Sequence, residues 1–242
     1  MKKILILPDL HGSNKWKQFL EVKPDHTIFL GDYVDSFEAT DTEIIENLQE
    51  IINYKKNHLD KVTLLWGNHD VQYLHFPDSY WNCSGYRASY APVIHHLFEE
   101  NKKLFKIAHV IDNYLFTHAG VLYEWLESFK HLIKKSPLSE QNFSLDELLN
   151  EGFNSNFNYK FGEVGYRRGG FKGSNGSPLW ADLTEVVKEF DTYTGSPPIP
   201  YNQICGHNHS KTHVTLRHST SRLNFTVLDT GTTNYSPLIL II

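Results

Sequence analysis

Cysteine and long hydrophobic runs are both scarce in this chain of 242 residues. Its two cysteines, Cys83 and Cys205, are too few for a disulfide scaffold. No run approaches the roughly 20 apolar residues of a membrane span, and the apolar run 4–7 is too short for the core of a signal peptide. We therefore expect a protein of the reducing cytoplasm that has no membrane partner.

Basic residues are fewer than acidic residues, with 23 Lys and Arg and 28 Asp and Glu. Surfaces that bind nucleic acid in general are basic, so we do not expect such binding, although a local basic pocket is compatible with the composition. Aromatic residues make up 14% of the chain, enough to build a substantial core. The length suits a single domain over residues 1–242.

The first part of the chain alternates strand-like and helix-like segments. Aliphatic runs at 2–8, 26–30 and 62–66 predict buried strands, and 41–57 has helical spacing behind a capping box of Thr40 and Glu43. Further predicted elements are a hairpin of 106–111 and 114–117, helices near 121–135 and 144–151, and strands at 203–206, 224–228 and 237–242. This order predicts an α/β fold with two packed sheets and outer helices, in which residues 121–180 form a lid-like insertion.

Side chains that can bind a metal ion follow the predicted strands directly. They are Asp9, His11, Asp32, Asn68, His118, His207 and His209. This mixture of oxygen and imidazole donors suits Mn, Fe, Zn or Mg, and seven donors fit two ions if Asp32 bridges them. Two divalent ions beside Asp9 and Asp32 would keep a net charge of about +2 and attract a phosphate. A water that bridged the ions would have a lowered pKa and could act as a hydroxide nucleophile.

His69 and Asp35 stand beside these donors in the sequence. A protonated His69 could donate its proton to a leaving oxygen, and Asp35 could hydrogen-bond the ring and keep it cationic. We predict catalytic roles for His69, Asp35 and Asn68. The alternatives are a structural hydrogen bond for His69 and a turn or capping role for Asp35.

Five short motifs resemble those of the calcineurin-like metallophosphoesterase superfamily, in the same order. They are Asp9-x-His11, Gly31-Asp32-x-x-Asp35, Gly67-Asn68-His69-Asp70, His118-Ala119-Gly120 and Gly206-His207-x-His209. The resemblance implies a four-layer α/β/β/α sandwich, with one ion on Asp9, His11, Asp32 and His209 and the other on Asp32, Asn68, His118 and His207. Manganese is the favoured metal. The run 31–35 and the run 117–120 are most similar to the serine/threonine phosphoprotein phosphatases and their bacterial and phage relatives.

Two arginines of that branch are replaced here by Ser36 and Trp66. A guanidinium from another segment would therefore have to hold the phosphate. We predict substrate-binding roles for Arg167 and Arg168 in the glycine-rich stretch, with Arg87 as a rival and a solvated loop as the alternative.

The sequence as a whole predicts a dinuclear metal-dependent phosphomonoesterase, because two metal ions and a nearby cation suit a dianionic phosphate. Its substrate would be a phosphorylated small molecule, nucleotide or phosphoprotein. A phosphodiesterase or a dinucleotide polyphosphate hydrolase is the alternative activity. A non-catalytic binding scaffold on the same fold is the alternative of another class.

Overall fold

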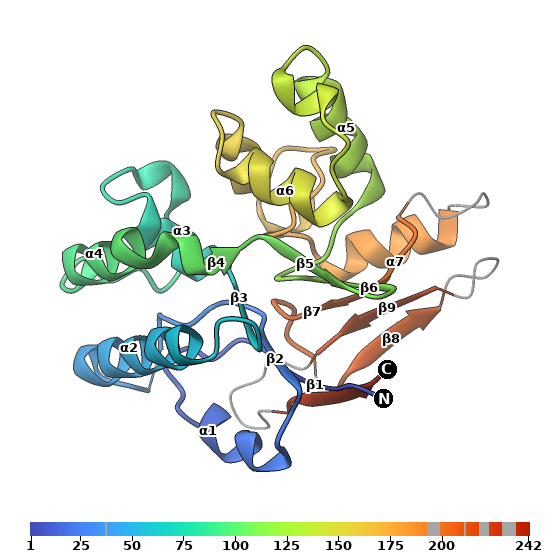
Figure 1. The fold of residues 1–242 in the computed structure, drawn as a ribbon. Helices are drawn as coiled ribbons and strands as arrows, with labels where there is room; N and C mark the ends of the chain where they lie inside the picture. Colours follow the sequence, from blue (N-terminus) through green and yellow to red (C-terminus); the bar gives the residue numbers. More distant parts are fainter. Residues whose placement is uncertain (37, 193–198, 211, 218–222, 229–235) are drawn as a thin grey trace. The chain divides into compact units, whose positions relative to one another are not determined.

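The computed structural model describes residues 1–36, 38–192, 199–210, 212–217, 223–228 and 236–242. The chain divides into two compact units, a first unit of residues 1–106 with 230–242 and a second unit of residues 107–229. Each unit contains one five-stranded sheet with helices packed against it (Figure 1). The predicted α/β class with two sheets is confirmed, and the single domain stays a prediction.

The sheet of the first unit has the strand order β10-β1-β2-β3-β4. Its strands are β1 (Lys3–Leu7), β2 (His26–Phe29), β3 (Val62–Leu65), β4 (Phe105–Lys106) and β10 (Leu238–Ile241). Strands β1 to β4 run parallel, and β10 is antiparallel to β1. The aliphatic runs of β1 and β3 are buried, as expected for central parallel strands. Because β1, β2 and β3 are parallel neighbours, the loops after them lie at one edge of the sheet.

The helical segments of the first unit are α1 (Trp16–Phe19), η1 (Leu20–Val22), α2 (Asp41–Asn57), α3 (Asn68–Leu74), η2 (Ser79–Trp81), α4 (Ala91–Asn101) and η3 (Lys102–Leu104). Helix α2 has its predicted bounds, and both hydrogen bonds of the Thr40–Glu43 capping box are present. The N-cap position of α1 belongs to Lys15, whose side chain makes no capping hydrogen bond. Helix α3 was not predicted, and it begins inside the Gly-Asn-His-Asp motif.

The sheet of the second unit has the strand order β5-β6-β7-β9-β8. Its strands are β5 (Ala108–Ile111), β6 (Tyr114–Thr117), β7 (Asn202–Cys205), β8 (Val214–Arg217) and β9 (Asn224–Val227). The predicted hairpin of β5 and β6 is confirmed, and β6, β7 and β9 run parallel. Strand β8 was not predicted, because this edge strand is only partly buried and pairs with β9 alone among the described strands.

The helical segments of the second unit are α5 (Tyr123–Ile133), η4 (Pro137–Glu140), α6 (Leu145–Phe153), η5 (Asn158–Gly162), η6 (Tyr166–Arg168) and α7 (Leu183–Thr192). Helices α5 and α6 confirm the two helices predicted within 121–180. They meet on an aromatic cluster, in which the ring of Phe161 lies 5.5 Å from the rings of Phe129 and Phe153. This part of the chain therefore has a packed core of its own.

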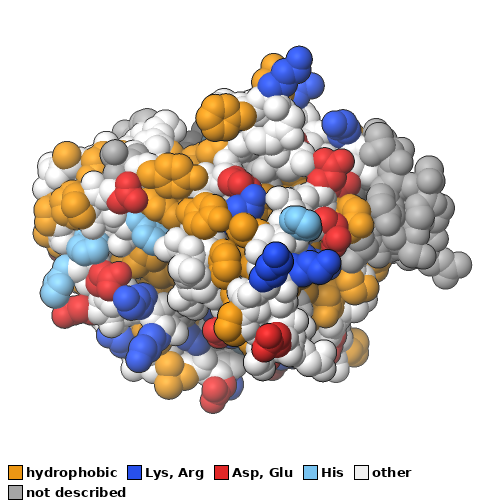
Figure 2. Space-filling model, turned by 90° about the horizontal axis from the view of Figure 1, so that it is seen from above, with side chains coloured by type: hydrophobic (Ala, Val, Ile, Leu, Met, Phe, Trp, Pro, Cys, Tyr) orange, Lys and Arg blue, Asp and Glu red, His pale blue; other side chains and the backbone are white. Residues whose placement is uncertain are grey.

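Lys and Arg side chains are interspersed with Asp and Glu over the face drawn in Figure 2, so the described residues there form no continuous basic field. Among the described residues, no helix is both long enough and apolar enough to cross a bilayer.

Candidate metal centre and catalytic dyad

The loops after β1 and β2 bring together three of the predicted metal ligands. Ligand atoms of Asp9, His11 and Asp32 all lie within 4.8 Å of one another. The backbone ties the two loops, since the N–H groups of Leu10 and His11 donate to the carbonyl oxygen of Asp32 at 3.0 and 2.8 Å. Asp9 and Asp32 are buried, so a divalent ion would offset the cost of burying their charges.

Several candidate site residues have left-handed backbone conformations. The φ angle is 45° at His11, 52° at Asp32 and 62° at Asp35 in the first unit, and 66° at His207 in the second. Such angles are uncommon for residues other than glycine, and they cluster at functional sites when the surroundings hold them in place. The strained residues here coincide with residues that the motifs single out.

Asp70 fixes the loops that carry these ligands. Its carboxylate accepts hydrogen bonds from the backbone N–H groups of Asp32 at 2.8 Å, Tyr33 at 2.9 Å and Gly67 at 2.9 Å. Burial, followed by the negative charge of Asp32, holds the pKa of Asp70 well above its usual value, although the three hydrogen bonds oppose this. Asp70 therefore joins the end of β2 to the start of α3. Asp70 belongs to the Gly-Asn-His-Asp motif, but the motif did not predict that its carboxylate binds the backbone of these loops.

Glycine at positions 31 and 67 allows the same two loops to touch. A Cβ atom on Gly67 would lie 2.1 Å from Oδ1 of Asp32, and one on Gly31 would lie 2.5 Å from the backbone nitrogen of Gly67. The close approach lets the N–H of His69 donate to Oδ1 of Asp32 at 2.9 Å. Asn68, in the first turn of α3, is buried beside them.

His69 and Asp35 form a hydrogen-bonded pair in the first unit. Nδ1 of His69 lies 2.9 Å from Oδ2 of Asp35, and the side chain of Asp35 is fully buried. Burial lowers the pKa of His69, but the charge of Asp32 and hydrogen bonds with Asp35 and Cys83 outweigh it and hold this pKa well above its usual value. The structure thus brings together the two residues for which the sequence predicts acid and orienting roles.

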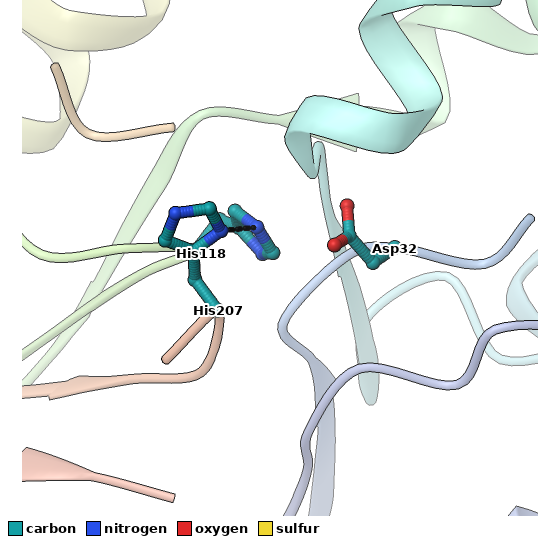
Figure 3. Close-up of side chains that lie close together, drawn as sticks. All are labelled: Asp32, His118 and His207. Atoms are coloured by element: carbon teal, nitrogen blue, oxygen red, sulfur yellow. Dashed lines mark hydrogen bonds between the residues drawn. The ribbon is translucent and has the colours of Figure 1, made fainter. Parts of the chain in front are cut away.

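His118 and His207 are neighbours in the second unit. His118 follows β6 and His207 follows the parallel strand β7, so both side chains come from the same edge of the sheet. Nε2 of His118 lies 3.1 Å from Nδ1 of His207, as the dashed line in Figure 3 shows. Both residues are buried, whereas His209 is exposed and its role as a ligand stays a prediction.

Arg168 lies against the histidine motif of the second unit. Its Nη2 donates to Oδ1 of Asn208 at 2.8 Å, and its Nε lies 3.2 Å from Oδ2 of Asp182. Asn208 occupies the unspecified position of the Gly-His-x-His motif, so no pattern in the sequence singles it out. Arg167, the other predicted phosphate-binding residue, is exposed.

Arg87, the rival to these arginines, is bound within the first unit. Its guanidinium donates to Oδ1 of Asp41 at 2.7 Å and to the carbonyl oxygens of Ser36 and Ala39. These contacts fasten the loop before α4 to the segment that follows Asp35, which favours a structural role for Arg87.

Comparisons with known proteins identify the family. The calcineurin-like phosphoesterase family matches residues 2–211, so the chain belongs to this family. The resemblance drawn from the five motifs is therefore confirmed, and the family depends on a pair of metal ions. The sequence has no match among the curated proteins.

Solved structures support the fold. A protein serine/threonine phosphatase from Saccharomyces cerevisiae, described as similar to human phosphatase PP5, is 14% identical and has a TM-score of 0.50. The match covers 94% of this chain and 67% of that chain. The phosphoesterase Yfce from E. coli is 15% identical over 48% of this chain and 57% of its own, but its TM-score of 0.25 is too low to support an argument.

Proposed function

We propose that the protein is a phosphomonoesterase that requires two divalent metal ions. The proposal assigns one ion to Asp9, His11, Asp32 and His209, and the other to Asp32, Asn68, His118 and His207. The cluster of Asp9, His11 and Asp32 and the pair of His118 and His207 support this assignment. Carboxylate, amide and imidazole donors without thiolate fit Mn²⁺ first and Fe, Zn or Mg next. When bound, the ions would supply Lewis-acid activation of water and of the phosphoryl group.

The contact between His69 and Asp35 is the observation that carries the catalytic part of the proposal. Because Nδ1 of His69 faces Asp35 at 2.9 Å, Nε2 is the nitrogen through which this ring can deliver a proton to the leaving oxygen. Asp35 orients the ring and stabilises its charged form. A binding scaffold would have no need of such a pair.

Arg168 is the best placed cation for the substrate phosphate. Asn208, the residue after His207, and Asp182 fix its guanidinium, and an arginine has further N–H groups with which to bind phosphoryl oxygens. Arg167 is the second candidate. Residues 121–180, which carry both arginines and have their own aromatic core, would act as the lid of the site.

A substrate panel with defined metal loading tests the proposal. Metal-free protein is supplied with Mn²⁺ and assayed on phenyl phosphate, bis-p-nitrophenyl phosphate, a diadenosine polyphosphate and a phosphopeptide. We expect Mn²⁺-dependent hydrolysis of the monoesters. Preference for the diester or the dinucleotide would replace the monoesterase assignment, and no hydrolysis with Mn²⁺, Fe²⁺, Zn²⁺ or Mg²⁺ would favour the scaffold.

A further inference from the structure

The carboxylate of Asp35 has three side-chain partners besides His69. Besides His69, its Oδ2 accepts a hydrogen bond from Nε2 of Gln72. Its Oδ1 accepts from the hydroxyl of Tyr90 at 2.8 Å and from the hydroxyl of Tyr73. Each carboxylate oxygen thus has two partners, and the side chain is inaccessible to solvent.

The two tyrosines come from different segments of the chain. Tyr73 lies on α3, the helix that begins with Asn68 and His69, whereas Tyr90 precedes α4. The phenolic oxygens lie 3.4 Å apart, and the rings lie 5.4 Å apart. Helix α3 and the segment before α4 therefore both bind the carboxylate of Asp35, each through one tyrosine. A shift of either segment would disturb the position of Asp35.

Tyr90 also contacts the backbone of Asp35. The N–H of Asp35 donates to the hydroxyl oxygen of Tyr90 at 3.3 Å, at a residue whose φ angle is 62°. A left-handed aspartate persists only where its surroundings hold it in place. Tyr90 therefore restrains both the main chain and the side chain of the residue on which His69 depends.

The surroundings of both hydroxyls favour their protonated form. Burial, together with the charge of Asp35, raises the pKa of Tyr73 and of Tyr90 far above that of a free tyrosine. Each phenol can therefore act as a donor to the carboxylate. The hydroxyl oxygen of Tyr73 also accepts from the N–H of Arg87 at 2.9 Å, which fixes the direction of its own hydrogen bond.

We propose that Tyr73 and Tyr90 are positioning residues that hold Asp35 in the orientation in which it binds Nδ1 of His69. Through Asp35 they set the direction in which His69 presents Nε2 to the leaving oxygen. The inference rests on the proposed function for its catalytic consequence. The contacts themselves lie within the first unit, and neither tyrosine belongs to any of the five motifs.

The kinetic test replaces each hydroxyl by hydrogen, in Tyr73→Phe, Tyr90→Phe and the double variant. The Mn²⁺-loaded proteins are compared on phenyl phosphate, whose leaving group needs a proton, and on p-nitrophenyl phosphate, whose leaving group needs little help. Because a general acid contributes about 10²- to 10⁴-fold, we expect roughly a tenfold loss of kcat on phenyl phosphate for the double variant and a much smaller loss on the nitrophenyl ester. Equal losses on both esters would overturn the inference.

Tyr86→Phe is the matched control. The ring of Tyr86 stacks on Tyr73 at 5.2 Å, but in the described part of the chain its hydroxyl makes no hydrogen bond to Asp35. We expect this variant to match the wild-type protein on both esters. A selective loss on phenyl phosphate in Tyr86→Phe would show that removing a nearby hydroxyl has this effect even without a contact to Asp35, and it would overturn the inference.

A second measurement separates this inference from the proposed function. In metal-free protein labelled with ¹⁵N-histidine, the Nδ1–H signal of His69 is assigned by its absence in His69→Ala. We expect this signal to move or to exchange faster in Tyr73→Phe and in Tyr90→Phe. An unchanged signal would overturn the positioning role even in an active enzyme, whereas a changed signal would support it even if the proposed activity failed.

Discussion

Oδ2 of Asp70 accepts a hydrogen bond from the backbone N–H of Asp32 at 2.8 Å, so a buried carboxylate fixes the main chain of a predicted metal ligand. In Asp70→Asn an NH₂ group replaces one carboxylate oxygen. This NH₂ group would face a backbone N–H that now donates to the carboxylate, and that N–H would lose its acceptor. Because a buried group left without its partner costs about 1–3 kcal/mol, we expect a loss of this size in the free energy of unfolding. Urea unfolding of metal-free protein measures it. An unchanged midpoint would show that Asp70 does not hold the loops.

Gly67→Ala should damage the site without a backbone penalty. The φ angle of Gly67 is −105°, which alanine adopts freely, but its Cβ would lie 2.1 Å from Oδ1 of Asp32. Since a 1 Å displacement at a catalytic site can cost about 10²-fold, we expect a loss of that order in kcat/KM and weaker metal retention.

Gly169→Ala is the opposite case and serves as the control. Gly169 has a φ angle of 95°, and a Cβ there would meet nothing within 4 Å. We expect a loss of about 1 kcal/mol in stability and no change in metal content. Similar metal loss in both variants would contradict the steric explanation for Gly67.

His69→Ala should lose activity according to the leaving group. On phenyl phosphate we expect a decrease in kcat of about 10²-fold or more, because the departing oxygen must take up a proton. On p-nitrophenyl phosphate the decrease should be much smaller. Steady-state kinetics on both esters at equal metal loading measures the difference, and equal decreases would refute the acid role.

Much of this site could be predicted because its ligands follow strands in short motifs. Asp9, His11 and Asp32 lie next to buried aliphatic runs, so parallel pairing of β1 and β2 was enough to bring them together. Helix α2 was predicted to the residue because its capping box is a local signal.

The remaining contacts depend on tertiary structure. Tyr90 reaches Asp35 across 55 residues, and Arg168 reaches Asn208 across 40, with no pattern in the sequence that links either pair. Strand β8 was missed for a related reason. Its residues alternate between half-buried and exposed, so its sequence does not differ clearly from that of a polar loop. Only the pairing with β9 identifies it as a strand.

Arg168→Ala should weaken substrate binding more than Arg167→Ala. Arg168 is fixed by Asn208 and Asp182, whereas Arg167 is exposed. A charge-assisted hydrogen bond contributes about 1.5–3 kcal/mol, so we expect KM to rise roughly tenfold or more in Arg168→Ala. Arg168→Lys should restore little, because an ammonium cannot copy the fork of the guanidinium. A larger effect in Arg167→Ala would transfer the role to Arg167.

Asp32→Asn should release both metal ions, because the proposal makes Asp32 the ligand that they share. Replacing a carboxylate by an amide removes the negative charge that both ions would contact, while the volume stays almost the same. Asp35→Asn is the matched control, since Asp35 binds His69, Gln72, Tyr73 and Tyr90. We expect elemental analysis after dialysis to find about two ions per chain in the wild type and in Asp35→Asn, and far fewer in Asp32→Asn. Loss of a single ion from Asp32→Asn would assign Asp32 to one metal only, and full occupancy would remove it from the ligand set.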